Sequence, residues 1–383
     1  MNRRNKICFV VSSPMTAQAF LQGHICSLAK DFDVYLVANF KSHDEISELY
    51  IKDAFQLDIY REISIKHDIA AVAKLYSYFR RERFDAVHSI TPKAGLITAL
   101  AAYLSGIKHR IHIFTGQVWA TKHGFDRFLL KSIDKLIVLL DTDILIDGKS
   151  QRQFLLSEGV LSARKSQVFG EGSISGVNID KFTPDDTIRN KVRKEIGIPN
   201  DDIVYMFLGR LNRDKGIYEL LSSFNKLAAN YKNVYLLIAG SDEEGCLKHL
   251  PEYPSISDKE NFHYYGFTKT PEILLNAGDI FCLPSYREGF GSSVIEASSM
   301  ELAVICSDTY GVMDAMVDNE TGLRCKVADI GSLYDCMAAF VKKPSLIRTF
   351  GMKGRQRVIE KFSGELVTNH WVDFYHTLLN DKV

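Results

Sequence analysis

The sequence lacks the features that would mark a nucleic-acid-coating or non-globular protein. Its 383 residues contain 47 Lys and Arg against 47 Asp and Glu, so the formal net charge is zero. A protein that coats nucleic acid is expected to carry a strong basic excess, which the chain as a whole does not have. With 46% hydrophobic and 25% charged residues, the composition excludes a disordered, collagen-like or coiled-coil chain.

Metal-binding patterns are missing as well. The seven cysteines are scattered, no two of them form a CxxC pair, and no histidine flanks them at the spacing of metal ligands. An odd number of dispersed cysteines is typical of thiols used as small apolar residues in a reducing compartment. We therefore expect no structural zinc site.

Long apolar runs are few. Residues 7–11 are too short for the core of a signal peptide, which needs roughly 7–15 apolar residues, and are better interpreted as a buried strand. Residues 94–107 fall short of the roughly 18–20 residues that span a bilayer. We expect a cytoplasmic chain without a transmembrane helix.

What the sequence does contain is a regular alternation of short apolar runs with amphipathic stretches. Such alternation predicts strands joined by right-handed helical crossovers, and hence a parallel sheet covered on both faces. Residues 124–140 could pass for a strand, but their apolar positions follow helical spacing. Because the pattern fills two parts of similar size, we predict an α/β protein with two doubly wound, Rossmann-like domains that face a cleft. The predicted strands are 6–12, 33–38, 85–89, 110–114 and 143–146, then 203–208, 234–239, 261–265, 280–284 and 304–307.

The boundary between the two domains is best placed in residues 170–186, which are rich in Gly and Ser and lack an apolar period. We predict one domain over 1–175, a second over 176–361, and a carboxyl-terminal helix within 362–383 that crosses back to the first domain. The first 175 residues hold 23 basic and 18 acidic residues, a net charge of +5, which leaves −5 for the remainder. The overall neutrality is therefore a cancellation.

The most informative segment is GDIFCLPSYREGFGSSVIEASSM, residues 278–300. It predicts a strand ending at Pro284, a glycine-containing loop, and a helix that begins near Ser292, a layout that aims backbone N–H groups and the positive helix end at an anion such as phosphate. Glu288 and Glu296 lie eight residues apart, and a carboxylate accepts hydrogen bonds from two adjacent hydroxyls, as in a polyol. A lone pair of glutamates at this spacing is usually an ordinary feature of a capped helix, but the Pro-Ser and Gly-Phe-Gly context favours a binding site.

The second segment is VYMFLGRLNRDKGIYELLSSF, residues 204–224. A strand ends at Gly209, and Arg210 and Lys215 stand in the polar loop that follows, where ligands bind in open parallel sheets. These two positions suit anchors for a diphosphate, whereas Arg213 between them is interpreted as solvated. Neither segment has the spacing of a P-loop or of GxGxxG, which weakens an ATPase or dehydrogenase interpretation.

At these two segments the sequence resembles retaining glycosyltransferase family 4, a large group with the glycosyltransferase-B fold. GRLNRDKG and PSYREGFGSSVIEA are similar to its two signature segments, GVNIDKFTP resembles its GVDxxxFxP connector, and IAGSDEE, residues 238–244, is similar to its next strand and turn. The resemblance is specific over about 170–330 and looser before that. It implies a glycosyltransferase-B architecture in which 1–175 binds the acceptor and 176–361 binds a nucleotide-sugar donor.

The resemblance also implies roles for individual residues. Arg210 and Lys215 would neutralise the diphosphate of the donor as it leaves, and Glu288 would accept hydrogen bonds from hydroxyls of the donor sugar. Glu296 would accept them from the ribose diol. The other implied donor-binding residues, in the phosphate cradle and the base pocket, are Gly209, Gly266, Phe267, Phe290, Gly291 and Ser292.

One departure from the family concerns the catalytic base. Many members have His, and some Glu, just before a glycine that follows an amino-terminal strand, whereas here Thr115 precedes Gly116. Either that role is absent, or His112 or Gln117 supplies something similar. A front-face mechanism, in which the leaving phosphate oxygen takes the acceptor proton, would need no base. The triplet Asp-Thr-Asp at 141–143 resembles a DxD metal motif but is interpreted as an acidic turn, so we expect neither a metal nor another cofactor.

The amino-terminal half contains the candidate membrane and acceptor residues. Residues 66–135 include 12 basic and 5 acidic residues, and we predict that this excess meets an anionic membrane surface, with a solvated helix face as the alternative. In helix 67–82 the cations lie near Leu75, Tyr76 and Phe79. One candidate, the histidine at the end of strand 85–89, could equally be a buried structural residue. The candidate acceptor residues are Ser12, Ser13, His88, Lys93, Thr115 and Gly116.

We therefore predict a retaining, metal-independent glycosyltransferase that moves a sugar from a UDP donor onto an undecaprenyl-diphosphate-linked saccharide. An N-acetylhexosamine is the first candidate for the sugar, followed by galactose or a sugar from a GDP donor. The enzyme would act peripherally at the inner face of a bacterial cytoplasmic membrane, in O-antigen or capsule assembly, with no nucleic-acid partner. Two alternatives stay open: a nucleotide-sugar 2-epimerase of the same fold, and a non-catalytic nucleotide-sugar binding protein.

Overall fold

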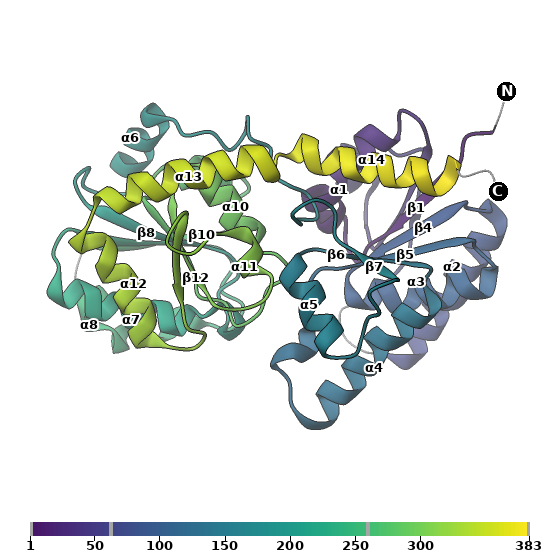
Figure 1. Cartoon of the computed structure of the whole chain (residues 1–383), viewed down its shortest axis with the longest axis horizontal. Coiled ribbons are helices and arrows are strands. Elements are labelled where there is room, and N and C mark those ends of the chain that lie inside the picture. Colours follow the sequence, from purple (N-terminus) through teal and green to yellow (C-terminus); the bar gives the residue numbers. More distant parts are fainter. Residues whose placement is uncertain (1–2, 61–63, 258–260, 381–383) are drawn as a thin grey trace. The chain divides into compact units, whose positions relative to one another are not determined.

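The structure of the chain is a computed structural model that describes residues 3–60, 64–257 and 261–380 (Figure 1). The chain forms two compact units, Met1–Gly176 with Gly364–Val383, and Val177–Ser363. Each unit is built on its own parallel sheet covered by helices. The prediction of an α/β protein with two Rossmann-like domains is confirmed.

The first unit contains a seven-stranded sheet in the order β3-β2-β1-β4-β5-β6-β7. On one face α1 and α14 contact each other, and on the other α3 packs against both α2 and α4 (Figure 1). The elements are β1 (Lys6–Val10), α1 (Pro14–Leu28), β2 (Asp33–Ala38), η1 (His43–Ile46), β3 (Asp53–Gln56), α2 (Ile65–Glu82), β4 (Ala86–Ile90), α3 (Pro92–Ser105), β5 (His109–Phe114), η2 (Val118–Thr121), α4 (Gly124–Leu140), β6 (Asp143–Ile146), α5 (Lys149–Ser157), β7 (Ser166–Gln167) and α14 (Gly364–Asn380).

The central strand β1 shows why these strands are continuous apolar runs. Side chains alternate between the two faces of a strand, so Ile7 and Phe9 pack in the core beneath α1 and α14, while Cys8 and Val10 pack in the core beneath α2 and α3. Because helices cover both faces, neither set of alternate positions can be polar.

The last helix, α14, completes the core of the first unit. Trp371 and Tyr375 are fully buried, and the Trp371 ring stacks between His24 and His88 at centroid distances of 4.5 and 4.9 Å. The His24 ring nitrogens lie 2.9 Å from Thr368 Oγ1 and 2.7 Å from a backbone carbonyl oxygen. Stacking and hydrogen bonds therefore fix a segment that follows the second unit in sequence onto the sheet of the first.

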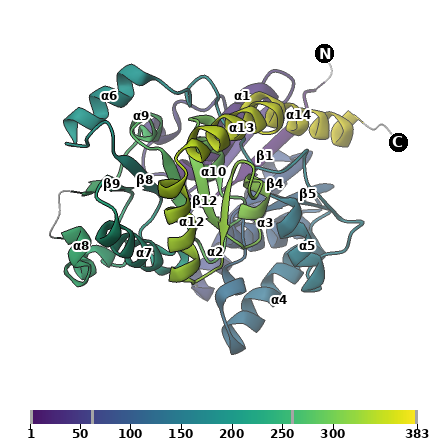
Figure 2. The ribbon, with the colours of Figure 1, turned by 60° about the vertical axis from the view of Figure 1, so that its left-hand side comes forward.

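The second unit contains a six-stranded sheet in the order β10-β9-β8-β11-β12-β13. Helices α7 and α12 lie side by side in both views (Figures 1 and 2), and α10 packs against α13. The elements are α6 (Asp186–Glu195), β8 (Ile203–Leu208), η3 (Arg213–Lys215), α7 (Ile217–Asn230), β9 (Val234–Ala239), η4 (Cys246–Glu252), α8 (Pro254–Ser257), β10 (Phe262–Gly266), α9 (Pro271–Leu275), β11 (Ile280–Leu283), α10 (Ser292–Ser299), β12 (Ala303–Ser307), α11 (Val312–Ala315), β13 (Gly322–Cys325), α12 (Ile330–Lys342) and α13 (Ser345–Lys361).

Three strands were not predicted from the sequence, and all three are short and lie at sheet edges. β7 has two residues, β3 has no fully buried residue, and β13 begins with glycine. An edge strand is covered less than a central one, so it lacks the apolar run on which the other predictions rested. The sequence placed the unit boundaries at 175/176 and 361/362, and the structure divides the chain after Gly176 and after Ser363.

Candidate active site

The predicted donor residues gather at the carboxyl edge of the second sheet. β8 and β11 are neighbours in this sheet, so the loops that follow them, 209–216 and 284–291, lie next to each other. Ligands of open parallel sheets bind at the carboxyl ends of the strands. The two signature segments, although distant in sequence, thus form one surface.

Lys215 and Glu288 meet on this surface. The Lys215 ammonium forms an ion pair with Glu288 Oε1, which also accepts a 2.8 Å hydrogen bond from Ser285 Oγ. The two charged side chains are only 20% and 12% exposed, so solvent and salt screen the pair less than a surface pair. The structure therefore brings together two of the three residues predicted to be catalytic.

Arg210, the third predicted catalytic residue, contacts a different carboxylate. Its Nη1 lies 3.1 Å from Glu243 Oε2, in the loop after β9, and Asn212 Nδ2 donates to the same oxygen at 3.2 Å. The Arg210 side chain is nearly half exposed, so an incoming anion can reach it. Glu243 lies in the segment 238–244 that resembles the family, but it was not predicted as a site residue.

A second ion pair, which the sequence did not reveal, ties the two loops together. Asp214 Oδ2 accepts hydrogen bonds from Arg287 Nη2 at 2.7 Å and from Arg287 Nε at 3.0 Å, and the Tyr286 amide donates to the Asp214 carbonyl oxygen at 2.8 Å. Gly216 has a φ of 70°, and a Cβ there would collide with the carbonyl oxygen of Pro284. Glycine at this position therefore allows the close approach of the loops.

The glycine loop leads into α10 as predicted for an anion site. Phe290 is buried against Phe362 with ring centroids 5.2 Å apart, and Gly291 takes a φ of 83° immediately before the helix. Among the described residues, no side chain caps the amino end of α10, which starts at Ser292. Its first amides and the positive end of its dipole are left for an anion.

Glu296 lies on α10, one turn after Ser292, and is partly buried. Burial raises the pKa of its carboxyl to about 7, while the charge of Lys181 lowers this pKa and that of Glu272 raises it. Ionising such a carboxyl near neutral pH is costly unless hydrogen-bond donors stabilise the anion, and a diol supplies two.

Close backbone packing joins the carboxyl ends of β8, β9 and β10. The Gly240 amide donates to the Gly266 carbonyl oxygen at 2.9 Å, and a Cβ on Gly240 would collide with the Gly209 carbonyl oxygen. Phe267 follows Gly266 and exposes most of its ring. Gly266 and Phe267, which were predicted to line a base pocket, therefore lie close to the loop that carries Arg210.

The candidate acceptor residues of the first unit follow the ends of its strands. Ser13 Oγ lies 3.1 Å from Thr16 Oγ1 in the turn after β1, which also contains Ser12. Lys93, in the first turn of α3, forms an ion pair with Asp68 of α2 at 2.9 Å, so a phosphate would have to compete for its charge.

The segment after β5 holds the position at which the sequence departs from the family. Thr115 and Gly116 are partly buried there. Gln117 is fully buried and its Oε1 accepts a 3.2 Å hydrogen bond from Gln151 Nε2. An amide in this place has no proton-accepting basicity, so Gln117 does not replace the missing base.

His88 and His112 are core residues of the first unit. His88 is fully buried, its Nδ1 lies 2.8 Å from the Tyr375 hydroxyl, and its ring stacks on Trp371. Burial lowers the pKa of His112 to about 3, and its Nδ1 lies 2.8 Å from Ser89 Oγ. For His88 the structure shows the buried structural role that the sequence left open, and His112 is too enclosed to act as a base.

Two of the three apolar residues named in helix 67–82, now α2, face inward. Leu75 and Phe79 are buried in the core, and Tyr76 is exposed. These two core side chains are therefore unable to contact a membrane, whereas Ile65, Ile69 and Tyr76 are exposed together with the basic residues of α2. Membrane contact through 66–135 as a whole stays a prediction.

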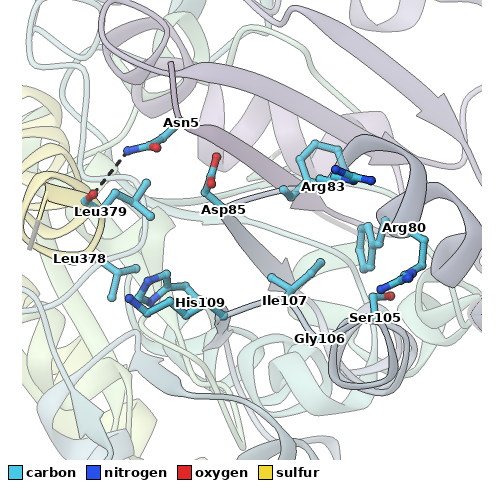
Figure 3. A pocket seen from close by; sticks show the side chains of 13 residues that line it. Asn5, Arg80, Arg83, Asp85, Ser105, Gly106, Ile107, His109, Leu378 and Leu379 are labelled. Atoms are coloured by element: carbon cyan, nitrogen blue, oxygen red, sulfur yellow. Dashed lines mark hydrogen bonds between the residues drawn. The ribbon is translucent and has the colours of Figure 1, made fainter. Parts of the chain in front are cut away.

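A cavity of about 490 Å³ lies at the amino-terminal edge of the first sheet, away from the strand ends described above (Figure 3). Arg80, Arg83 and Lys108 lie near the carboxyl ends of α2 and α3, where positive charge offsets the negative end of a helix dipole. None of the predicted site residues lines this cavity. Its lining is Asn5, Phe79, Arg80, Arg83, Phe84, Asp85, Ser105, Gly106, Ile107, Lys108, His109, Leu378 and Leu379.

Two further searches cover residues 3–60, 64–257 and 261–380. In these ranges no three His, Cys, Asp or Glu side chains form a group that could hold a metal ion. Within the same ranges, every helix is too short or too polar to cross a membrane.

The two Rossmann-like units of the chain have the glycosyltransferase-B fold. The chain shares this fold with HepE from Anabaena, solved in complex with UDP-glucose, at a TM-score of 0.80 and 15% identity over 97% of this chain and 99% of that one. Residues 188–357 match the family described as "Glycosyl transferases group 1". CapM of Staphylococcus aureus, a capsular polysaccharide biosynthesis glycosyltransferase, is 30% identical over 354 residues, 92% of each chain.

The chain therefore belongs to the group 1 glycosyl transferases, and the resemblance stated from its signature segments is confirmed. It is a glycosyltransferase. A relative from Escherichia coli, "UDP-Gal:alpha-D-GlcNAc-diphosphoundecaprenol alpha-1,3-galactosyltransferase", is 22% identical over 87% of this chain and 86% of its own length. Another from Campylobacter jejuni, "N,N'-diacetylbacillosaminyl-diphospho-undecaprenol alpha-1,3-N-acetylgalactosaminyltransferase", is 24% identical over 78% of each chain.

Proposed function

We propose that this enzyme transfers a sugar from a UDP donor to an undecaprenyl-diphosphate-linked saccharide, with retention of the anomeric configuration, in the assembly of a bacterial surface polysaccharide. The observation that carries the proposal is the ion pair of Lys215 with Glu288 beside the amino end of α10. A nucleotide sugar presents a diphosphate next to a ring rich in hydroxyls. A cation, a carboxylate and helix amides at one sheet edge match both parts of it.

In the proposed transfer, the bond between the anomeric carbon and the diphosphate oxygen breaks while the acceptor hydroxyl oxygen bonds to the same face of that carbon. Lys215 and Arg210 neutralise the charge that develops on the diphosphate, and comparable groups stabilise transition states by about 3–4 kcal/mol each. The leaving phosphate oxygen takes the proton of the acceptor hydroxyl. No protein base is then needed, which fits a threonine at position 115.

Donor binding changes the partner of each cation. In the free enzyme Lys215 is held by Glu288, and Arg210 by Glu243. A diphosphate that takes over both cations releases the Glu288 carboxylate, which can then accept hydrogen bonds from the donor sugar. The ion pair thus keeps both groups oriented until the donor replaces it.

The proposed substrates are supported by the names of related proteins. The E. coli and C. jejuni relatives are named for transfer to diphospho-undecaprenol-linked sugars, and the solved HepE complex contains UDP-glucose. We take an N-acetylhexosamine as the first candidate for the donor sugar, as in the name of the C. jejuni relative. Galactose, as in the name of the E. coli relative, comes next, followed by a sugar from a GDP donor.

We further propose what the reaction requires, where it takes place and which partners the enzyme has. Lys215, Arg210 and the amides of α10 supply the positive charge that a metal ion supplies in other enzymes, so we expect no metal or other cofactor to be required. The enzyme would act in the cytoplasm at the inner face of the membrane, where a lipid-linked acceptor is presented. Its partners would be the donor, this acceptor and the anionic lipid surface, without nucleic acid.

The test is a panel of radiolabelled nucleotide sugars (UDP-GlcNAc, UDP-GalNAc, UDP-galactose and GDP-sugars) with lipid-linked acceptors from bacterial membranes. We expect one donor to label the lipid fraction, and Glu288→Ala and Lys215→Ala to lower the rate about 100-fold or more. Arg213→Ala, in the same loop, is the matched control and should retain the rate.

Three outcomes would contradict the proposal. Equal rates for the wild type and both variants would remove these residues from the reaction. Consumption of the donor without an acceptor would indicate a 2-epimerase. Binding of a nucleotide sugar without turnover, in the presence of acceptor, would indicate a binding protein.

A further inference from the structure

Helix α4 has an apolar face that no described part of the chain covers. The opposite face packs inward: Ile137 is fully buried, and the buried Asp134 carboxylate accepts a 2.7 Å hydrogen bond from Trp119 Nε1. The uncovered face, which we call the outer stripe, consists of Phe125, Phe128, Leu129, Leu136 and Leu139.

The spacing of the outer stripe places its side chains on one side of the helix. Steps of three, four, eleven and fourteen residues from Phe125 all fall within a narrow sector of a helix with 3.6 residues per turn. Phe125, Phe128 and Leu139 are 73%, 68% and 74% exposed. A contiguous exposed apolar surface of this kind marks an interaction site.

The basic residues in and just before α4 divide into two groups, and Asp126, next to Phe125, is an exposed acid. Arg127 and Lys131 both pair with Glu158, at 2.8 and 2.7 Å, and both lie over the Trp119 ring, so they anchor the helix to the unit. Lys122 and Lys135 are exposed, and within the described residues no ion pair or hydrogen bond engages either ammonium. Lys122 precedes the stripe in sequence and Lys135 lies beside it on the helix surface.

We propose that the outer stripe inserts into the interface of an anionic lipid bilayer. Aromatic and leucine side chains on one face with lysines beside them are the composition of helices that lie in a membrane interface. The outer stripe begins just after η2, and η2 follows the carboxyl end of β5. This is the edge of the first sheet at which Thr115 and Gly116 also lie. This inference rests on the proposed function, because a lipid-linked acceptor is presented at such a surface.

The alternative occupant, a second copy of the chain, fits the charges less well. Pairing two stripes would gather Lys122 and Lys135 of both copies, four cations against two Asp126 carboxylates, around one apolar interface, which leaves a net repulsion. An anionic membrane surface instead attracts the lysines, by about fivefold in affinity for each. The charge around the stripe therefore favours lipid.

Flotation of the full chain with lipid vesicles tests the inference. One set of vesicles contains phosphatidylcholine alone and the other also contains phosphatidylglycerol. We expect the wild type to float with the anionic set, and the double variant Phe125→Ser/Phe128→Ser to lose about tenfold or more in partitioning. The matched control, Ile65→Ser/Ile69→Ser, removes two equally exposed apolar side chains from α2, 72% and 65% exposed, and should float like the wild type.

A second variant and a second acceptor separate the possible failures. Lys122→Gln/Lys135→Gln should weaken binding to anionic vesicles only. Transfer to a water-soluble, short-chain acceptor should be unchanged by all these variants. If the wild type itself does not transfer sugar to this acceptor, that result counts against the proposed function and not against the outer stripe. The inference is overturned if the Phe125→Ser/Phe128→Ser variant floats like the wild type. It is also overturned if sedimentation shows that the wild type and the control are dimers and that this variant alone is a monomer.

Discussion

Each cation predicted to bind the donor diphosphate is held by a carboxylate of the protein itself. The Arg210–Glu243 pair is solvent-exposed, and the Lys215–Glu288 pair is mostly buried. An exposed pair contributes only about 0–1 kcal/mol, so the diphosphate can displace Glu243 at little cost. We infer that Glu243 occupies the position of the ligand's charge in the free enzyme and competes weakly with it.

Substituting Glu243 with glutamine should therefore strengthen nucleotide binding. We expect the Kd for UDP to fall by up to about fivefold at low salt, and the gain to shrink as added salt screens the competing carboxylate. Isothermal titration calorimetry measures the change. Glu195→Gln, at another exposed acid of the second unit, is the control and should leave the Kd unchanged. A weaker affinity in Glu243→Gln would show that Glu243 positions Arg210 for the ligand instead.

Glu296 should make nucleotide binding depend on pH. Folding raises the pKa of the Glu296 carboxyl to about 7, so this carboxyl stays protonated in the free protein at pH values at which an ordinary glutamate is ionised. Its contribution to the free energy of unfolding therefore becomes less favourable as the pH rises towards 7. A ribose diol that donates to the ionised form reverses this preference. We expect affinity for UDP to rise between about pH 6 and 8, with release of up to about one proton.

The control for this prediction is Glu296→Gln, which removes the titrating group and keeps the shape. Titration of the phosphate itself affects both proteins equally, so only the difference between their pH profiles reports on Glu296. Calorimetry in buffers of different ionisation enthalpy measures the proton release. Identical pH profiles for the wild type and the variant would exclude contact between this carboxyl and the nucleotide.

At the scale of elements, the site depends on how two loops are held together. The carboxyl ends of β8 and β11 bring the loops close, and the Asp214–Arg287 pair and the close approach of Gly216 to Pro284 fix them. Neither Asp214 nor Arg287 is proposed to contact the substrate. Their effect would be to keep Lys215 and Glu288, the adjacent residues in each loop, at the distance that donor binding requires.

A double-mutant cycle tests this positioning role. Asp214→Ala and Arg287→Ala should each lower kcat about tenfold with a smaller change in KM, and the double variant should be little worse than either single one. The resulting coupling energy is expected at about 1–2 kcal/mol. Additive losses in kcat would show that the two residues act independently.

The same scale shows what the sequence can and cannot predict. Buried parallel strands such as β8 and β11 are short apolar runs, so the fold could be predicted. Glycines with nearby charges follow both strands, which made Lys215 and Glu288 candidates, and the structure shows that the two residues pair at one sheet edge. The Asp214–Arg287 pair joins residues 73 positions apart, and nothing in local spacing distinguishes it from solvated charges. The burial of His88 and the outer stripe of α4 likewise depend on what the fold covers, which periodicity alone does not determine.

For the whole molecule, the zero net charge conceals a basic and an acidic part of the chain. The basic excess before residue 176 lies in the unit that carries the candidate acceptor residues and α4, and the signature segments lie in the other. Membership of the group 1 glycosyl transferases shows the class of reaction. We propose in addition that Lys215 and Glu288 act together on a UDP-sugar, and that the transfer requires no metal and no protein base.

The most direct test of this claim is one transfer reaction followed by NMR of its product. Purified enzyme, the donor identified by the panel and a soluble diphosphate-linked acceptor are incubated with EDTA, and the anomeric configuration of the new linkage is compared with that of the donor. We predict transfer at an undiminished rate, with an α-linked product from an α-linked donor, and its loss in Lys215→Ala and Glu288→Ala. An inverted product, or a rate that falls with EDTA and returns with added metal, would contradict the account.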